Sequence, residues 1–508
     1  MPSRRQFLTS TSAAGLAALS AGVPADATVR RRRNPSITFY GAAGRVSGSC
    51  HLLETSKGLY LIDCGLFMSD TENRDEKNAE FPFDPKDVKA VFLTHAHTDH
   101  NGRLPLLVKK GFRGAIHCTD ATRDLNRVML RSSLEVGEEE GLSLYDRDDQ
   151  QRSFGLIEAA PYNKRITRSG LDCRYTDAGH ILGSAMIEIW ADGRKILFSG
   201  DMGPNGVPIL CNPTQHRDAD AVLFESTYGA VRGEATDYQE FGARLRAVLD
   251  RGGSVLLPSF ALHKTQTLIH LINGLREDGV IPKDVPLFSD SSSAHRSTEI
   301  YDAFPQYYDP AASTARTERG GTLFYRPGYF EARDDDTLTS HGKGPAIYLS
   351  TSGMLDHAAA PKHLAELAGD PKNAVFLVGY QAPGTVGHQV RSGESPVRLP
   401  IEEFGEPTQY RVREMKLEVD TLSGFSSHAK GQQILEWLAG FDSVGPAYVV
   451  HGSPDRSAAM AEAATGMGVR AQAPAEGDSF EVTGERFTPT PAPTLPERGA
   501  DGFAASDN

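Results

Sequence analysis

The sequence predicts a mixed α/β protein that is built from more than one domain. Its 508 residues exceed the size of one ordinary domain, so we expect two or three structural units. Hydrophobic residues make up 39% of the chain and aromatic residues 8%, as in globular proteins. Short apolar runs, which predict buried strands, alternate with segments whose apolar residues recur at helical spacing. We therefore expect layers of sheet covered by helices.

The composition restricts the classes of partner. The net charge of −13 makes the chain a poor non-specific binder of nucleic acid, so a polyanionic substrate would need a local site with metal ions. No run of 18 apolar residues occurs, which argues against a membrane span. The odd number of cysteines, five, argues against a full disulfide framework, although a bridge between Cys50 and Cys64 stays open.

The N-terminus has the features of an export signal. The hexapeptide Ser-Arg-Arg-Gln-Phe-Leu at residues 3–8 resembles the bacterial twin-arginine motif, and a weakly apolar run follows from Ala13 to Val23. Ala-Asp-Ala at residues 25–27 fits a cleavage site. We expect a signal peptide over residues 1–27 and a periplasmic or extracellular protein; a cytoplasmic location is the alternative.

Between residues 36 and 228, apolar runs repeatedly end at a residue that can carry chemistry. One helix is expected, over Ala121–Val136, where the apolar residues have helical spacing. Strands that end in this way place functional groups along one rim of a sheet. The runs are Leu59–Ile62 before Asp63, Val91–Thr94 before His95, Lys195–Phe198 before Asp201, and Ala221–Phe224 before Glu225.

From about residue 229 to 411 helices alternate with continuous apolar strands, which predicts a doubly wound parallel sheet. The polar segment Asp309–Asp336 is expected to be a long loop. A helix over Lys430–Leu438 and a strand over Ala447–Val450 follow. The expected elements of the middle stretch are helices Asp237–Leu249 and Thr265–Arg276, and strands Val255–Leu257, Ala346–Leu349 and Val375–Val378.

The densest cluster of candidate metal ligands lies in one short loop. His95, His97, Asp99 and His100 place three imidazoles and a carboxylate within six residues. Zinc takes nitrogen and oxygen ligands, so this density indicates two zinc ions side by side. The first two histidines leave one side of the loop and can bind one ion. The aspartate and the third histidine leave the other side and can bind the second.

Three residues further along the chain complete the ligand set. His180, in Asp-Ala-Gly-His after the expected strand Arg174–Thr176, adds a ligand to the first ion. Asp201, in Ser-Gly-Asp, can bridge both ions with its two oxygens. His451, in His-Gly at a strand end, completes the second ion. The sequence therefore predicts two Zn²⁺ per chain.

These residues resemble the metal motifs of the metallo-β-lactamase superfamily. His-x-His-x-Asp-His at residues 95–100, His180 and Asp201 occur in the usual order of that superfamily. Asp63 matches its first motif, an aspartate that braces the metal loop and does not bind metal.

A second set of residues resembles the β-CASP branch, whose members process nucleic acids. Glu225 in Glu-Ser-Thr-Tyr-Gly resembles motif A, His428 in Phe-Ser-Ser-His motif B, and His451 in Val-His-Gly motif C. A histidine at motif C is associated with RNA-directed members, whereas DNA-directed members tend to have valine. Further segments that resemble this branch are Leu257–Ala261, Ser352–Leu355 and Gly379–Gly387.

The resemblance spans roughly residues 36–486 and implies the fold. An αββα sandwich would form from two separate stretches, residues 36–228 and 415–487. A doubly wound α/β β-CASP domain, residues 229–414, would be inserted between them. Residues 488–508, with four prolines and many small or acidic residues, are predicted to be a disordered tail.

The resemblance also implies a zinc-dependent ribonuclease. Two metal ions about 3.5–4 Å apart would bind a bridging hydroxide that attacks the phosphorus of single-stranded RNA. His428 is the candidate general acid for the leaving 3′-oxygen, and Glu225 would orient it. Asp201 would bridge the metals and Asp63 would brace them. The substrate would lie in a cleft between the body and the inserted domain, and the products would carry 5′-phosphates.

Several alternatives stay open. One is an exported two-zinc hydrolase that acts on DNA or on a small phosphodiester or ester. Another is a non-catalytic RNA-binding subunit, which would be expected to have lost ligand residues. The sequence distinguishes neither internal from terminal cleavage nor a monomer from a homodimer.

Overall fold

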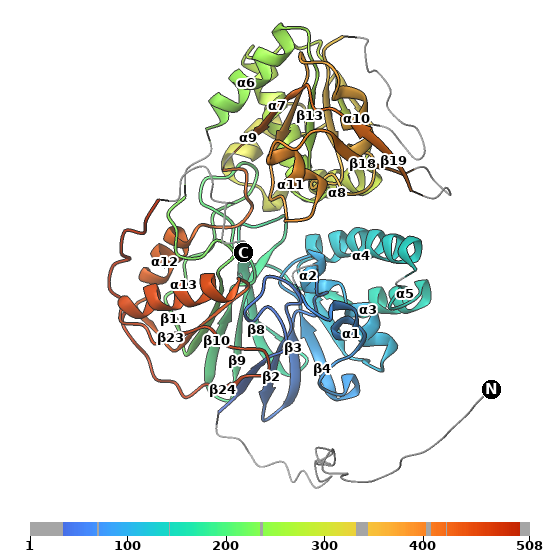
Figure 1. The fold of residues 1–508 in the computed structure, drawn as a ribbon. Helices are drawn as coiled ribbons and strands as arrows, with labels where there is room; N and C mark the ends of the chain where they lie inside the picture. The colour runs from blue at the N-terminus through green and yellow to red at the C-terminus, as the bar shows by residue number, and fades with distance from the viewer. Residues whose placement is uncertain are drawn as a thin grey trace, which may run out of the picture.

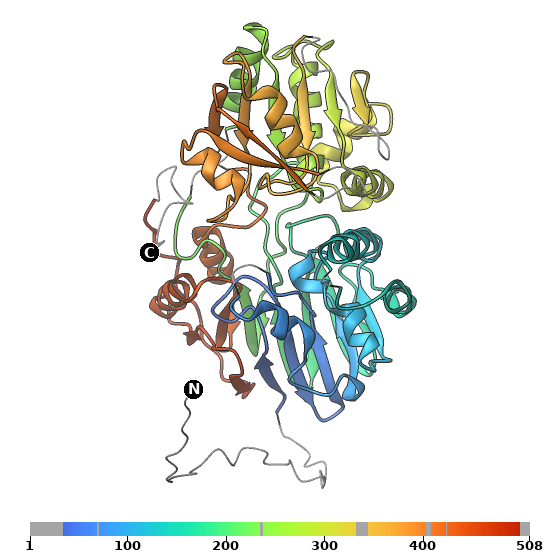
Figure 2. The same ribbon diagram turned by 45° about the vertical axis from the view of Figure 1, so that its right-hand side comes forward.

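The protein consists of two bodies, one above the other (Figures 1 and 2). The lower body contains the first and last parts of the chain, and the upper body contains the middle. The predicted signal peptide, residues 1–27, lies outside the described residues. No helix in the described part is long and apolar enough to cross a membrane. The computed structural model describes residues 34–68, 71–141, 143–233, 237–331, 344–402, 408–422 and 424–497.

The lower body is a sandwich of two seven-stranded sheets. The first has the order β24-β1-β2-β3-β4-β5-β6, with β1 Ser36–Phe39, β2 His51–Thr55, β3 Gly58–Ile62, β4 Val88–Phe92, β5 Ala115–Cys118, β6 Ile157–Ala159 and β24 Ser479–Glu481. The second has the order β23-β22-β12-β10-β9-β8-β7, with β7 Ile166–Arg168, β8 Leu171–Asp177, β9 Ala185–Ala191, β10 Arg194–Phe198, β12 Ala221–Glu225, β22 Ala447–Val450 and β23 Ala471–Gln472. A short parallel pair joins β11 Asp218–Ala219 to β21 Ser443–Val444.

Apolar side chains from both sheets meet in one core between them. Phe39, Ile62 and Phe92 of the first sheet and Ile189 and Phe198 of the second all belong to this core, each at most 2% exposed. Removing this apolar surface from water is the main stabilising term. Helix α3 packs on the outer face of the first sheet, and α12 and α13 pack on the outer face of the second. The predicted αββα sandwich is confirmed.

The first part of the lower body has more helices than the one predicted. The predicted helix is α4, which is longer than expected, and four others were missed. Helices α2 and α3 are too short to show a helical period, and α5 is mostly polar, so none gave a clear apolar stripe. The helices of this body are α1 Arg74–Ala79, α2 Thr98–Asn101, α3 Leu104–Lys109, α4 Asp120–Glu140, α5 Arg147–Gly155, α12 Gly431–Ala439 and α13 Pro454–Gly466, with a 3₁₀ turn at Pro85–Asp87.

The upper body is a six-stranded parallel sheet with helices on both faces, as predicted for a doubly wound domain. Its order is β15-β14-β16-β13-β17-β20, with β13 Val255–Pro258, β14 Leu287–Ser289, β15 Tyr329–Glu331, β16 Ile347–Ser350, β17 Ala374–Leu377 and β20 Glu418–Thr421. The helices are α6 Tyr238–Asp250, α7 Lys264–Glu277, α8 Ser292–Ala303, α9 Pro310–Glu318, α10 Ala360–Leu367 and α11 Val386–Arg391. An antiparallel ribbon, β18 Val397–Ile401 with β19 Gln409–Arg413, and a 3₁₀ turn at Pro305–Tyr307 complete it.

One prediction for the upper body was wrong. The segment Asp309–Asp336, expected to be a loop, contains α9 and β15 in its described part. The Asp309 side chain accepts a hydrogen bond from the Ala312 N–H (2.6 Å) and Pro310 opens the helix, a standard helix start. Only Ala312 of this helix is buried, so its apolar period was invisible in the sequence.

The two bodies contact each other around α8 and the residues that follow it. The hydroxyl of Tyr301 accepts a hydrogen bond from the Leu182 N–H at 3.1 Å. The Asp309 N–H donates to the Ile209 carbonyl at 2.8 Å, and the Tyr307 hydroxyl donates to Asp120. The upper body is therefore fixed to the loop that carries His180.

Two further features concern the sulfur groups and the C-terminus. All five cysteines are free thiols, including Cys50 and Cys64. Residues 488–497 of the predicted tail lie against the lower body: Thr490 N–H donates to the Met467 carbonyl, and the backbone N–H of the buried Leu495 donates to the Gln432 side chain, both at 2.8 Å. The remaining residues, 498–508, lie outside the described part.

Candidate metal and catalytic centre

The first group of candidate ligands comes together where three strands of the lower body end. His95 and His97 follow β4, His180 follows β8, and Asp201 follows β10. His97 Nδ1 lies 3.2 Å from His95 Nε2 and 3.0 Å from His180 Nε2. Asp201 Oδ2 lies 3.4 Å from His95 Nε2 and 3.5 Å from His180 Nε2. The four donor atoms therefore face a common point.

The second group shares Asp201 with the first. Its other oxygen, Oδ1, lies 3.3 Å from His100 Nε2 and 3.4 Å from His451 Nε2. Asp99 Oδ2 lies 3.3 Å from His451 Nε2. The structure thus brings all seven predicted ligand residues together, with one Asp201 oxygen directed at each group. Their binding of metal stays a prediction.

The donor atoms fit divalent metal ions. A tetrahedral zinc site with bonds of 2.0–2.1 Å has ligand–ligand edges of about 3.3–3.4 Å, close to the separations in both groups. Two buried atoms, His100 Nε2 and Asp201 Oδ1, make no hydrogen bond with the described residues. Buried polar atoms rarely stay unpaired, so a missing partner between them is expected. Five imidazoles and two carboxylates are ligands that zinc accepts.

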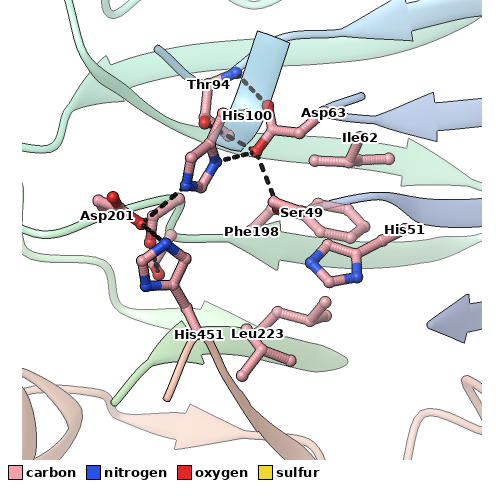
Figure 3. A pocket seen from close by; sticks show the side chains of 13 residues that line it. Ser49, His51, Ile62, Asp63, Thr94, His100, Phe198, Asp201, Leu223 and His451 are labelled. Atoms are coloured by element: carbon pink, nitrogen blue, oxygen red, sulfur yellow. Dashed lines mark hydrogen bonds and ion pairs between the residues drawn. The ribbon is translucent and has the colours of Figure 1, made fainter. Parts of the chain in front are cut away.

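Outer contacts fix the orientation of the ligands. Asp63 accepts hydrogen bonds from His100 Nδ1 at 2.7 Å, from the Thr94 N–H at 2.8 Å and from the Thr94 hydroxyl at 2.9 Å (Figure 3). His100 Nε2 is thereby left to face Asp201. His180 Nδ1 donates to the Ser427 carbonyl at 2.7 Å. Such contacts set the tautomer of a metal-binding histidine, and Asp63 lies where a brace would, outside the ligand set.

The two groups differ in their electrostatics. Burial lowers the pKa of His95 and His180 well below the usual value and that of His97 to about 4, so these imidazoles are neutral. Burial also opposes charge on His100 and His451, but Asp201 and Asp99 outweigh it. They raise the pKa of His100, and that of His451 to about 9.

His428 and Glu225 form a pair beside the ligand groups. His428 Nδ1 lies 3.1 Å from Glu225 Oε2 and 3.2 Å from Oε1. Glu225 is fully buried and also accepts from the Met202 N–H at 2.7 Å, whereas the His428 side chain is 20% exposed. Burial opposes protonation of His428, but Glu225 and then Asp201 raise its pKa. Glu225 therefore favours the protonated form of the His428 imidazole.

Family models match three consecutive stretches of the chain. The metallo-beta-lactamase superfamily matches residues 43–237, the Beta-Casp domain residues 265–390, and the Zn-dependent metallo-hydrolase RNA specificity domain residues 412–474. Ribonuclease TTHA0252 of Thermus thermophilus is 33% identical over 431 residues, which cover 84% of this chain and 94% of that one. The chain belongs to the β-CASP branch of the metallo-β-lactamase superfamily.

Other similar proteins are consistent with this β-CASP assignment. An RNase J-like protein of Methanocaldococcus jannaschii is 30% identical over 433 residues, covering 84% of this chain and 94% of that one. Transcription termination factor FttA of Methanosarcina mazei is 28% identical over 420 residues, covering 79% of this chain and 64% of that one. A solved structure of a protein of unknown function from Enterococcus faecalis V583 aligns with a TM-score of 0.53 at 11% identity, over 88% of this chain and all of that one; it supports the fold alone.

Sequence reasoning on this β-CASP protein missed two threonines at the centre. Thr94 holds Asp63, and its hydroxyl lies 3.0 Å from His95 Nδ1. Thr227 Oγ1 lies 3.1 Å from His451 Nδ1 and 3.3 Å from His428 Nδ1. Their only signal was proximity to motif residues, since Thr94 precedes the histidine loop and Thr227 follows the strand-end glutamate.

A pocket behind the second group is lined by Ser49, His51, Ile62, Asp63, Thr94, His100, Phe198, Ser199, Gly200, Asp201, Leu223, Val450 and His451 (Figure 3).

Proposed function

We propose that this β-CASP protein is a ribonuclease that holds two zinc ions and hydrolyses phosphodiester bonds in single-stranded RNA. The observation that carries the proposal is the position of Asp201. Its two oxygens face two groups of donor atoms, and Oδ2 lies 3.9 Å from Nδ1 of His428, the candidate acid. Such an arrangement suits hydrolysis of a charged ester better than binding alone.

The residues of the chain have separable roles in this reaction. When bound, a pair of divalent ions would lower the pKa of a bound water molecule and neutralise negative charge on the phosphate. Glu225 accepts the Nδ1 proton of His428, so that Nε2–H is the proton available to the leaving 3′-oxygen. A general acid of this kind contributes roughly 10²–10⁴-fold to the rate. Asp63 keeps His100 turned toward Asp201, and the product would carry a 5′-phosphate.

RNA is the better-supported substrate. Two relatives that are 33% and 30% identical over most of the chain are named as a ribonuclease and an RNase J-like protein. The histidine at residue 451 also favours RNA over DNA. A non-catalytic RNA-binding subunit would not need the complete ligand set, and DNA or small esters have no comparable support.

The test uses the purified full-length protein with zinc and end-labelled single-stranded RNA and DNA of matched sequence. We expect RNA to be cut to 5′-phosphate products and DNA to survive. The variants His97→Ala and His428→Ala should abolish or strongly reduce cleavage. If neither polymer is cut while metal analysis finds two zinc ions per chain, the ribonuclease proposal fails. The lengths of the labelled products distinguish internal cleavage from cleavage at an end of the RNA.

We also propose that residues 1–27 direct export through the twin-arginine route. The support is the Ser-Arg-Arg-Gln-Phe-Leu motif and the Ala-Asp-Ala site that follows it. Intact-mass analysis of the protein from the producing cells should give a chain that begins at Thr28. Replacing Arg4 and Arg5 together by lysine should leave the precursor in the cytoplasm. An uncut chain in the cytoplasm of wild-type cells would contradict export.

A further inference from the structure

Two lysines lie at the junction of the bodies without an acidic partner. Lys264 is the first residue of α7 in the upper body and is only 8% exposed. Lys430 immediately precedes α12 in the lower body. Within the described ranges, neither ammonium group makes a hydrogen bond or an ion pair with any residue. Contacts with aromatic rings can hold an ammonium group in such a place, but they leave its hydrogen-bond donors free for a ligand.

The surroundings of the two ammonium groups are aromatic and cationic. Lys430 Nζ lies 3.1 Å from the centroid of the Tyr228 ring, and Lys264 Nζ lies 5.9 Å from that of Phe425. Burial and then the charge of Lys430 lower the pKa of Lys264 to about 7. Burial and then Arg456 lower the pKa of Lys430 to about 8. The charge of Lys430 thus adds to the unfavourable environment of Lys264, and an anion between the two ammonium groups would relieve it.

The lysine pair is close to the candidate catalytic residues. Lys430 lies two positions after His428 and is close enough to Glu225 for its charge to act on the lysine. Lys264 follows His263, whose Nδ1 lies 3.1 Å from the Tyr301 hydroxyl. That hydroxyl in turn binds the Leu182 N–H of the His180 loop. Each body therefore contributes one cation to the same side of the centre.

We propose that Lys264 and Lys430 together bind a phosphate group of the RNA that neighbours the cleaved one. This inference deepens the proposed function and rests on it. Phosphate suits the site because lysine binds it as a compact charge with several donors. Glu225 acts on Lys430 through its charge, but no carboxylate of the described residues lies within ion-pair distance of either ammonium group. In a chain with a net charge of −13 such a local site is the means of holding a polyanion. The bound phosphate would also link the upper body to the lower body.

The first test measures equilibrium binding without cleavage. A short RNA labelled at its 3′ end is titrated in EDTA with the full-length protein and with Lys264→Gln, Lys430→Gln and the double variant, at several salt concentrations. We expect each single change to weaken binding about tenfold, and the slope of log K against log salt to fall by about 0.7 per lysine. The control Lys416→Gln alters an exposed lysine of the upper body, 58% exposed, and should leave binding unchanged. Unchanged affinity and slope in the double variant would overturn the inference.

The second test identifies the phosphate and separates this inference from the proposed function. Binding of RNA with a 5′-phosphate is compared with binding of RNA with a 5′-hydroxyl. If the variants lose the same affinity for both RNAs, the lysines bind a backbone phosphate. If they lose affinity only for the 5′-phosphorylated RNA, the lysines bind the terminal phosphate. In turnover, KM for RNA should rise more than kcat falls, and the loss on RNA should exceed any loss on bis(p-nitrophenyl) phosphate. Parallel losses on both substrates would mean that the lysines only support the metal centre. Lysine-dependent binding without RNA cleavage would leave phosphate binding by the two lysines standing and refute the ribonuclease.

Discussion

The lower and upper bodies contribute different residues to the surroundings of the candidate centre. The lower body supplies all seven candidate metal ligands and the His428–Glu225 pair from the ends of its strands and the loops beside them. The upper body supplies none of these residues; it contributes Lys264, at the start of α7. In the proposed reaction the lower body alone would carry the chemistry, whereas both bodies would share contact with the substrate, through Lys430 and Lys264.

The two regions also differ in how their polar groups are satisfied. In the lower body the second nitrogens of His95, His100, His180 and His451 each have a partner, so the ligands are fixed before metal arrives. The lysine pair has no such partners. Changes in the lower body should therefore alter metal content or rate, and changes at the junction should alter affinity.

The largest effect is expected from Asp201→Asn, since this residue serves both donor groups. Loss of an outer partner of a metal ligand typically costs 10–100-fold, and loss of a shared ligand should cost more than about 100-fold in rate. Zinc content measured by mass spectrometry should fall below two ions per chain. Asp442→Asn, at a carboxylate that is 73% exposed, is the matched control. Full activity in the Asp201 variant would refute the shared-ligand assignment.

Next in size is His428→Ala, which removes the candidate acid and spares the ligands. We expect kcat on RNA to fall roughly 10²–10⁴-fold with zinc content unchanged. Glu225→Gln should produce a smaller fall, because the imidazole remains but is less firmly oriented. The measurement is single-turnover cleavage alongside metal analysis. Loss of zinc in the alanine variant would instead place His428 among the ligands.

A smaller effect is expected from Asp63→Asn, which weakens the brace on His100. Zinc affinity should fall roughly 10–100-fold, and excess zinc should restore most of the rate. Competition with a chromogenic chelator measures the affinity. Were the rate to stay low at saturating zinc, Asp63 would have a role in the reaction beyond holding the metal loop.

The smallest expected effect concerns the contact between the bodies. Tyr301→Phe leaves the Leu182 N–H without its acceptor and should lower the free energy of unfolding by about 1–3 kcal/mol. KM for RNA should rise modestly while zinc content stays at two. Denaturant unfolding and steady-state kinetics measure the two quantities. A fall in zinc content would mean that the upper body helps to form the metal centre.

Much of the fold and of the candidate site could be predicted from the sequence. Apolar runs that end at Asp63, His95, Asp201 and Glu225 predicted strand ends, and the structure has β3, β4, β10 and β12 there. They lie two in each sheet of the sandwich, and not on the rim of one sheet as expected. In the upper body, strands β13, β16 and β17 and the two longest helices, α6 and α7, were also predicted, whereas β14, β15, β20 and α8 were not. The predicted elements are long and apolar, so burial leaves a clear period in the sequence.

What the sequence did not reveal has physical reasons. Helix α9 buries only Ala312, and α2 is a single turn, so neither leaves an apolar stripe. Thr227 acts through a hydroxyl whose partners come from a distant strand and loop. Lys264 and Lys430 belong to different bodies, and the charge of one acts on the other only because the two bodies dock. Polar contacts between remote segments leave no period to detect.

The most direct test of the account is anomalous X-ray diffraction at the zinc edge from crystals of the zinc-loaded protein. The account predicts two peaks, both in the lower body. One should lie among His95, His97, His180 and Asp201, and the other among Asp99, His100, His451 and Asp201. A single peak, a peak coordinated by His428, or a metal site in the upper body would contradict the claim that the two groups around Asp201 form the reactive centre.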